Sequence, residues 1–320
     1  MVRTRARLQG RDVAGALAGA VITFCVLACL AAPLYSSEVA GTSASDNHLS
    51  EQVVIDGVPT DVVSLSGIPI GPTWQKEFLL GADENGRDLM VRLLYGGRTT
   101  FVIAIGAVIL TVAIAVPLAL VAGYFRGKAD SVISRILDQL WSFPALLLGV
   151  LIGTALTARG FDVSPFKVSS SSALVPILVI GIVYVPYMAR PLRSHVLSLR
   201  GEAFAEAARA AGFSNRRIMF SELLPHLVPS MLVLGMLSLV NAVVLESALS
   251  FLGAGVDPPE PSVGSLIAAG LDTVLLSPHL LLVPCCALVL VVLSLSVLAE
   301  RLRDALDPRG RISRSDAVIR

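Results

Sequence analysis

Six long runs of apolar residues are the feature that most limits how this chain can fold. A helix needs roughly 20 mostly apolar residues to cross the ~30 Å hydrocarbon core of a membrane. Runs of about this length extend over residues 13–35, 99–125, 136–156, 173–188, 228–251 and 279–298. The whole chain is 54% hydrophobic and only 15% charged. It is therefore predicted to be an all-α integral membrane protein with six transmembrane helices, the first of them a retained anchor.

The positions of Lys and Arg predict the orientation, because cytoplasmic segments of membrane proteins hold these residues in excess. With the N-terminus inside, 19 of the 25 Lys and Arg residues fall in cytoplasmic segments. Both termini are therefore expected to be cytoplasmic. The expected regions are an N-terminus with the first helix (1–35), an external loop with an interfacial elbow helix (36–97), a core of five transmembrane helices (98–305) with a cytoplasmic loop (190–228), and a cytoplasmic tail (306–320).

The external loop shows two local patterns. The alternating stretch QVVIDGV predicts a short strand. The elbow helix at the end of the loop is expected to turn Leu89, Leu93 and Leu94 toward lipid and Arg92 toward water.

No metal, catalytic or cofactor site is predicted on the chain. The nearby acids Asp83, Glu84 and Asp88 lack the alternating ligand spacing of a calcium-binding EF-hand loop. The only Gly-Lys pair, Gly127-Lys128, lacks the first glycine and the Ser or Thr of a phosphate-binding loop. The net charge of +1 leaves no excess that would hold nucleic acid.

The stretch EAFAEAARAAGFSNRRIMFSELLPHLVPSM lies between two apolar runs and cannot itself cross a membrane. Strong helix formers from Glu202 to Ala211 predict a helix that Gly212 stops. Ser214 is expected to cap a second short helix, and Pro225 to end it.

Small residues give this segment a slim surface that another protein can approach closely. An amphipathic helix lying on the membrane is the alternative, but alanine would bury little area in lipid. The surface is expected to consist of alanines with a polar rim: Ala207, Ala208, Ala210 and Ala211, with Glu206, Arg209, Arg216 and Arg217.

Here the chain resembles the membrane-spanning subunits of binding-protein-dependent ABC importers. Their cytoplasmic loop carries EAA, three residues, Gly, and then a hydrophobic stretch ending in Leu-Pro. The matching residues are Glu206-Ala207-Ala208, Gly212 and Leu224-Pro225. The resemblance implies that this loop is a coupling helix that contacts an ATP-hydrolysing subunit.

Three further stretches are similar to the "C"-type permease of the dipeptide, oligopeptide and nickel importers. They are LLGADENGRDLMVRLLYGGRTTF, ESALSFLGAGVDPPEPSVG and LRDALDPR. Departures from the pattern occur at Ala82, Ala254 and Val263.

This narrower resemblance implies a type I ABC importer permease fold in a bacterial plasma (inner) membrane. The implied partners are a homologous second permease, two ATP-binding subunits, an external substrate-binding protein and membrane lipid. ATP and Mg would be bound by the partner subunits and not by this chain, which would be a non-catalytic translocation subunit. The expected cargo is a dipeptide or oligopeptide, with nickel and glutathione left open.

Two polar residues in the fifth run remain open between a pathway role and a structural role. Glu246 is an ionisable residue within a predicted span, five residues after Asn241. If it acted in the pathway, an ion-coupled secondary transporter would be the alternative function. An intramembrane enzyme is a further alternative, although no nucleophile with a matching base is apparent. Asp138 is interpreted as a local ion pair with Arg135.

Overall fold

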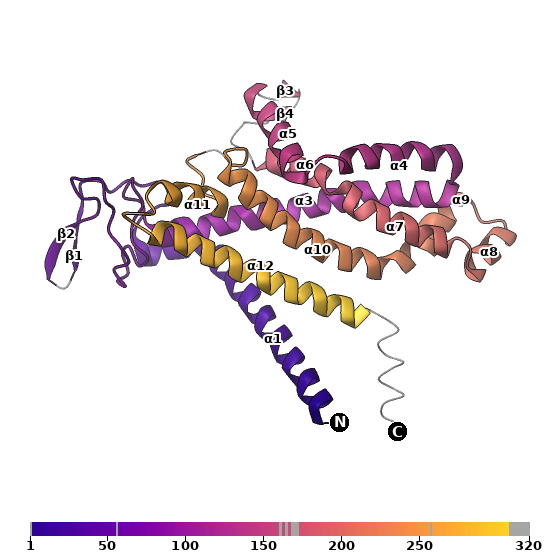
Figure 1. Ribbon diagram of the computed structural model, residues 1–320, viewed down its shortest axis with the longest axis horizontal. Coiled ribbons are helices and arrows are strands. Elements are labelled where there is room, and N and C mark those ends of the chain that lie inside the picture. Colours follow the sequence, from indigo (N-terminus) through magenta and orange to yellow (C-terminus); the bar gives the residue numbers. More distant parts are fainter. Residues whose placement is uncertain are drawn as a thin grey trace.

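The computed structural model describes residues 2–55, 57–159, 162–163, 166–167, 173–256 and 258–306. In chain order the elements are α1 (Val2–Leu30), α2 (Ala32–Leu34), η1 (Tyr35–Ala40), β1 (Gln52–Ile55), β2 (Val58–Asp61), α3 (Leu89–Phe125), α4 (Gly127–Trp141), α5 (Ala145–Arg159), β3 (Asp162–Val163), β4 (Phe166–Lys167), α6 (Leu174–Val183), α7 (Val185–Leu199), α8 (Ala203–Ala210), α9 (Asn215–Arg217), η2 (Ile218–Leu223), α10 (Leu224–Phe251), α11 (Val263–Asp272) and α12 (His279–Leu306). Helices α3, α4, α7, α10 and α12 run roughly along the long axis of the molecule, whereas α1 and α5 are inclined to it (Figure 1).

Within the described residues, four helical stretches are long and apolar enough to cross a membrane. They are Val13–Leu30, Leu89–Phe125, Asn215–Phe251 and His279–Leu306. Two bent pairs bring the total to six if each pair forms one span: α4 with α5, and α6 with α7. The mostly helical architecture agrees with the sequence prediction.

The predicted boundaries of the third and fourth spans are wrong. The run 136–156 is divided by a 90° bend between α4 and α5, where Pro144 follows Ser142 and Phe143. The run 173–188 bends by 40° at Tyr184, and Pro186 lies in the first turn of α7. Both breaks lie next to prolines, because a proline cannot donate the backbone hydrogen bond that would connect it to the preceding helical turn.

The predicted elbow is the first part of α3 and not a separate helix. At 1.5 Å per residue, the 37 residues of α3 extend over ~55 Å, which is more than the hydrocarbon core of a membrane. Arg92 does not point toward water: it is only 6% exposed, and it donates to the Ala44 carbonyl at 2.9 Å. Its Nε lies 3.4 Å from Asp83. The loop before α3 folds over this arginine, which a local pattern cannot reveal.

A small module of loops and one hairpin precedes α3. The predicted strand is confirmed as β1, which pairs with β2 in an antiparallel hairpin from Gln52↔Asp61 to Ile55↔Val58. Val62, Phe78 and Ala82 belong to the apolar core of the module.

Asp88 joins this module to the bundle at the start of α3. Its carboxylate accepts backbone hydrogen bonds from Met90 and Val91 in α3, and from Phe78 in the loop. Burial raises the pKa of the Asp88 carboxyl above its ordinary value, although these three N–H groups oppose the shift. The module is thus fixed to the bundle by buried hydrogen bonds.

Helix α11 packs closely against the helices around it because three contact points are glycines. A Cβ on Gly264 would lie 2.1 Å from the Ser247 carbonyl oxygen on α10. A Cβ on Gly270 would lie 2.5 Å from the backbone of Leu280 on α12, and one on Gly96 of α3 would lie 3.1 Å from the Ser262 carbonyl carbon. Only residues without a side chain permit these backbone approaches.

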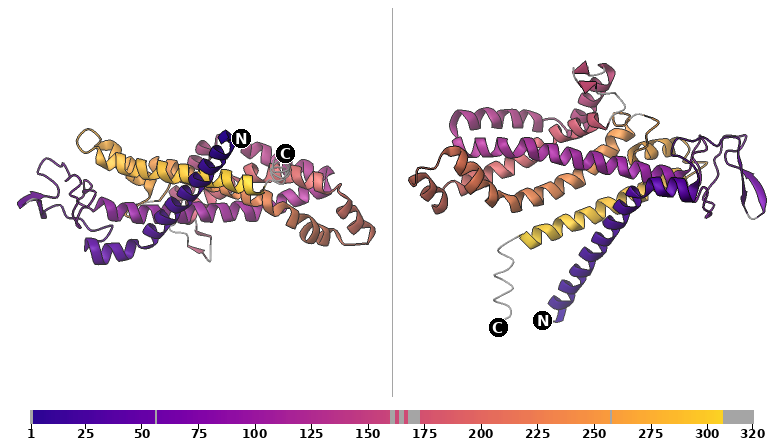
Figure 2. Two further views of the ribbon diagram at one scale, coloured as in Figure 1. Left: turned by 90° about the horizontal axis from the view of Figure 1, so that it is seen from below. Right: turned by 180° about the vertical axis from the view of Figure 1, so that it is seen from behind.

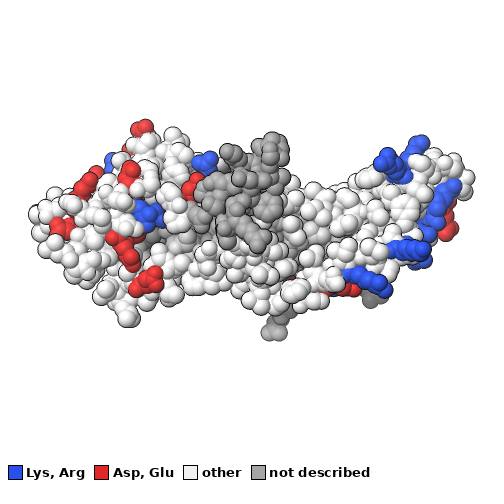
Figure 3. All heavy atoms as spheres, turned by 90° about the horizontal axis from the view of Figure 1, so that it is seen from above, with Lys and Arg blue, Asp and Glu red and all other residues white. Residues whose placement is uncertain are grey.

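The two ends of the bundle differ in charge. Helices α1 and α12 diverge from α10 at the ends that lie away from the hairpin (Figures 1 and 2). Lys and Arg side chains gather at the end that carries α8, whereas Asp and Glu are concentrated at the hairpin end (Figure 3). This polarity agrees with the distribution of charge that predicted the orientation.

Candidate functional site

The short helix α8 lies at one extremity of the bundle, opposite the β1–β2 hairpin (Figure 1). The chain leaves α7 through a tight turn in which Gly201 and Glu202 donate to the carbonyls of Ser198 and Leu199 at 3.1 Å. Glu202 then occupies the N-cap position of α8 in an extended conformation. The helix predicted from Glu202 to Ala211 is therefore confirmed within one residue at each end.

The predicted stop at Gly212 is also confirmed. Gly212 has a φ of +76°, in the left-handed region that glycine adopts without steric cost. Its N–H donates to the Arg209 carbonyl at 3.0 Å, and the Phe213 N–H donates to the Ala208 carbonyl at 3.1 Å. These two bonds form a Schellman motif, which satisfies carbonyls that the end of a helix would otherwise leave free.

The two faces of α8 have different surroundings. Ala205 and Ala208 are buried against the bundle, whereas Glu206, Ala207 and Ala210 are exposed. The expectation that Ala208 belongs to the outer surface is therefore wrong. Helical geometry places residues 205 and 208 on one side, and the structure turns that side inward.

The inner face of α8 joins the same hydrophobic core as α3, α7 and the start of α10. Ile218 and Leu223 are fully buried in this cluster together with Ala205. Phe204 stacks on the His226 ring with centroids 4.5 Å apart. A displacement of α8 therefore cannot occur without moving residues of the neighbouring helices.

Polar contacts connect the segment after α8 to α3. The Tyr124 hydroxyl donates to the Asn215 side-chain oxygen at 2.8 Å. The Arg217 guanidinium lies 3.9 Å from the centre of the Phe213 ring, a cation–π contact. The loop is thus attached on both sides of Gly212.

The second helix begins as predicted but does not end as predicted. Ser214 caps it by accepting a bond from the Arg217 N–H at 3.4 Å. The helix then continues through Pro225, because the π-helical segment η2 leads directly into α10 and Pro225 lies in the first turn of α10. A π-helical turn bonds residues five apart, which helps the helix continue where proline supplies no donor. Leu224 is half-buried and Pro225 is exposed.

Ion pairs connect α4 to α7 next to this loop. Arg193 donates to both oxygens of Asp130, at 2.5 and 2.6 Å. Asp138 pairs with Arg190 of α7 at 2.5 Å, so the predicted local pair with Arg135 is wrong. Arg190 also lies over the Trp141 ring at 5.1 Å. The bend after Trp141 keeps α4 beside α7, and this places Asp138 near a residue distant in sequence.

Glu246 is fully buried where α3, α10 and α11 meet. Ser250 donates to one carboxylate oxygen at 2.8 Å, and Ser247 lies 3.5 Å from the other. The hydroxyls of Thr100 and Ser262 lie beside the same carboxylate. Four hydroxyl groups from three helical segments therefore surround one carboxylate.

Asn241 is not brought together with Glu246. Its side chain donates to the Leu237 carbonyl on the preceding turn at 2.9 Å. Its own carbonyl accepts a bond from the Tyr184 hydroxyl at 3.3 Å, at the bend between α6 and α7. Five residues along a helix correspond to well over one turn, so the two side chains leave α10 in different directions.

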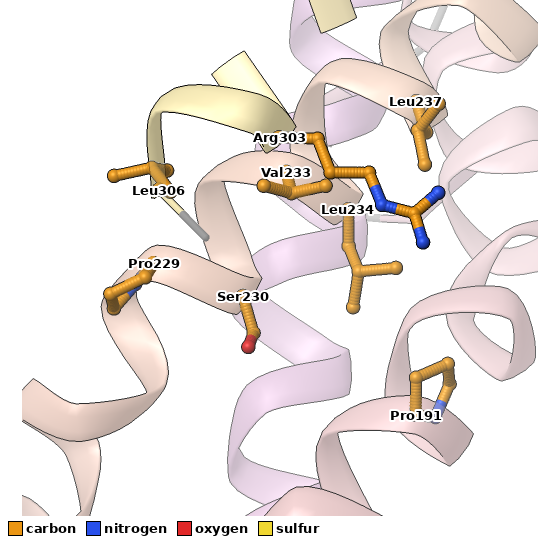
Figure 4. Close-up of a pocket in the computed structure, with 8 residues that line it drawn as sticks. All are labelled: Pro191, Pro229, Ser230, Val233, Leu234, Leu237, Arg303 and Leu306. Carbon is orange, nitrogen blue, oxygen red and sulfur yellow. The ribbon is translucent and has the colours of Figure 1, made fainter. Parts of the chain in front are cut away.

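A groove between α7, α10 and the end of α12 was missed at the level of sequence. It encloses about 410 Å³. The Arg303 guanidinium reaches across it and lies between Leu237 and Pro191 in the view of Figure 4. The groove depends on the placement of α7, α10 and the end of α12 beside one another, a tertiary feature that no local pattern reveals. The groove is lined by Pro191, Pro229, Ser230, Val233, Leu234, Leu237, Arg303 and Leu306.

Among the described residues, no group of three or more His, Cys, Asp or Glu side chains is placed to hold a metal ion. The polar clusters of this part of the chain consist of paired charges and hydroxyls.

Comparisons with known proteins connect this geometry to a family. Residues 115–312 match the profile of "Binding-protein-dependent transport system inner membrane component". The chain is 32% identical to a dipeptide transport system permease protein of Alkalihalophilus pseudofirmus over 90% of this chain and 84% of that protein. It is 32% identical to a glutathione transport system permease protein of Pectobacterium atrosepticum over 72% of each. It is 33% identical to a di/tripeptide transport system permease protein of Pseudomonas aeruginosa over 74% of this chain and 76% of that protein.

The fold also resembles a solved structure. A chain of the MetNI methionine ABC transporter, in an inward-facing conformation, superposes with a TM-score of 0.55. The two sequences are 19% identical, and the match covers 68% of this chain and 98% of the other. The resemblance extends to the fold of the helical core.

Proposed function

This chain belongs to the family of binding-protein-dependent transport system inner membrane components, and from that premise we propose that it forms half of the pathway of an ATP-driven peptide importer. It is a multi-pass protein of the bacterial inner membrane with a type I ABC importer permease fold. It is a non-catalytic subunit, because ATP hydrolysis in this family belongs to partner ATPases.

The bent helix pairs act as the third and fourth of six spans, and both termini lie in the cytoplasm. Three observations support this arrangement. The two pairs have the apolar length of spans, the Lys-rich and Arg-rich end of the bundle carries α8, and the external module lies at the acidic end. The start of α1 and the end of α12 both point away from the hairpin (Figure 2).

The coupling element is α8 with its glycine turn, made of Glu206, Ala207, Ala208 and Gly212, followed by Leu224 and Pro225. One observation carries this assignment: α8 exposes a face of small side chains while its inner face shares a core with α3, α7 and α10. A partner pressing on the outer face would therefore displace several helices together. Closure of two ATPase subunits around ATP and Mg would supply that movement, as a rigid-body transition between two states.

The complete transporter contains a second, homologous permease and an external substrate-binding protein besides the ATPase subunits. Cargo of the peptide class is supported by relatives whose names specify dipeptides, di/tripeptides and glutathione. These compounds share a peptide backbone, and we assign short peptides as the cargo on that basis.

No observation favours the alternative of an ion-coupled transporter. That function would require Glu246 to reach the pathway, whereas its carboxylate is enclosed by hydroxyls of the protein itself. We assign Glu246 the role of an anchor that holds α11 against α3 and α10, and Asn241 the role of a contact to the bend at Tyr184.

Substitution of Ala207 tests the coupling element. Ala207→Trp places a large side chain on the exposed face and leaves the buried face unchanged, so the permease is expected to fold but to lose its ATPase subunits during purification in mild detergent. Ala207→Ser is the matched control, and it should retain them. If the Ala207→Trp permease retained its ATPase subunits at the wild-type stoichiometry and supported wild-type uptake, α8 would not be the surface that contacts the ATPase.

A further inference from the structure

We propose that the groove between α7 and α10 is a cargo site on the cytoplasmic side of the pathway, in which Arg303 binds the carboxylate of a short peptide. This inference deepens the proposed function and rests on it. The groove lies at the ends of α10 and α12 that we assign to the cytoplasmic side, and Arg303 projects into it (Figure 4).

The charge of Arg303 has no partner among the described residues of the chain. No carboxylate in this part of the protein lies within ion-pair distance of its guanidinium. The side chain lies beside Val233, Leu234 and Leu237, so one side of the guanidinium faces an apolar wall. Arg303 is an exposed residue, and its guanidinium presents two parallel donors that match a carboxylate.

Two prolines in the wall of the groove each leave one backbone carbonyl of their own helix without a donor. Pro191 and Pro229 line it, and neither can donate to the carbonyl four residues earlier, at Tyr187 and Pro225. These two carbonyl oxygens therefore lack their usual helical donor. The Ser230 hydroxyl lines the groove and shares a hydrogen bond of 3.0 Å with the His195 ring. A volume of about 410 Å³ lies within the ordinary range of small-molecule sites.

The polar side chains of α7 near the groove are shielded from lipid in part by α4, because Tyr187 stacks on the Trp141 ring and Arg190 pairs with Asp138. Polar residues recur every three or four positions along α7 and therefore share one face. In a membrane protein such a face turns toward a cavity or another helix, because lipid offers polar groups no partners. The polar residues of this face are Tyr184, Tyr187, Arg190, Ser194 and Ser198, all exposed or half-exposed.

Thiol protection in the assembled transporter tests the assignment directly. The experiment uses Val233→Cys with the four native cysteines replaced, in the complete complex without nucleotide and without the external binding protein. The rate of alkylation at position 233 is measured with alanine peptides, from the dipeptide to the pentapeptide, as free acids and as C-terminal amides. Omitting the binding protein removes its own selectivity from the result.

At least one peptide is expected to slow alkylation as the free acid at a concentration about tenfold lower than its amide requires. A tenfold difference in affinity corresponds to one charge-assisted hydrogen-bond contact. Arg303→Gln should remove this difference, and Arg303→Lys should retain part of it. Equal protection by acids and amides, no protection by any peptide, or protection only by vesicles of anionic phospholipid would each overturn the assignment. Wild-type ATP-driven peptide uptake alongside such a result would refute this site alone, whereas absence of ATP-driven uptake would refute the proposed function.

Discussion

Replacing Gly264 by alanine is expected to separate α11 from the bundle. The new Cβ would lie 2.1 Å from the carbonyl oxygen of Ser247, and both contacting groups belong to rigid backbone. No rotamer change can relieve this overlap, so α11 must move by roughly 1 Å or more. The movement would pull Ser262, the N-cap of α11, away from Glu246.

The cost follows from these two effects. Overpacking of a tight contact typically costs about 1–3 kcal/mol. Loss of one hydrogen bond to a buried carboxylate costs about 1.5–3 kcal/mol. Together they amount to about 3–5 kcal/mol, which corresponds to a fall of roughly 5–10 °C in the unfolding midpoint. Gly235→Ala is the matched control, because a Cβ there meets nothing within 4 Å and alanine favours a helix interior by about 0.5–1 kcal/mol.

The assay is thermal unfolding of the two purified variants and the wild type in one detergent, with all three heated at the same rate. The folded fraction is measured by size-exclusion chromatography. The heating rate is fixed because unfolding of membrane proteins is often irreversible. An unchanged midpoint for Gly264→Ala, or an equal fall for Gly235→Ala, would refute the argument that this glycine permits the contact between α11 and α10.

Two further predictions concern the loop around α8. Gly212→Val forces a branched residue into a positive φ, at a cost of about 1–2 kcal/mol or more, and should reduce ATP-coupled uptake. Gly212→Asn should retain most of the uptake, because asparagine tolerates this conformation. Equal uptake by the two variants would contradict the role of the turn. A double-mutant cycle of thermal stability with Asp130→Asn and Arg193→Gln should give a coupling energy of about 1 kcal/mol. The value is modest because the ion pair is bidentate but partly exposed. Additive effects of the two substitutions would mean that the contact contributes nothing to stability.

The shared core around α8 gives the coupling proposal its physical basis. Ala205 and Ala208 face this core, and small residues there let the helix pack closely. Tyr124 connects the following segment to α3 through Asn215. A push on α8 therefore reaches the membrane helices through packed and hydrogen-bonded contacts, with no flexible linker between them.

The sequence by itself determined the features that depend on local physics. Apolar runs long enough to cross a membrane, the concentration of Lys and Arg in a few segments, and the spacing of Glu206 and Gly212 were sufficient to predict the class of protein and its family. The helix from 203 to 210, its stop at Gly212 and the Ser214 cap followed from helix propensity and capping rules. Each of these effects acts within a few residues, or between a residue and the lipid, so it leaves a readable pattern.

The tertiary structure decided everything that depends on contacts between distant segments. It turned Ala208 inward, placed a 90° bend between α4 and α5, and brought Asp138 beside Arg190. It buried Arg92 under the loop that precedes α3. It also enclosed Glu246 with hydroxyls and formed the groove at Arg303. The physical reason is that burial and pairing depend on which helices become neighbours. The pattern along one helix shows which residues share a face, but it does not show which other helix that face will contact.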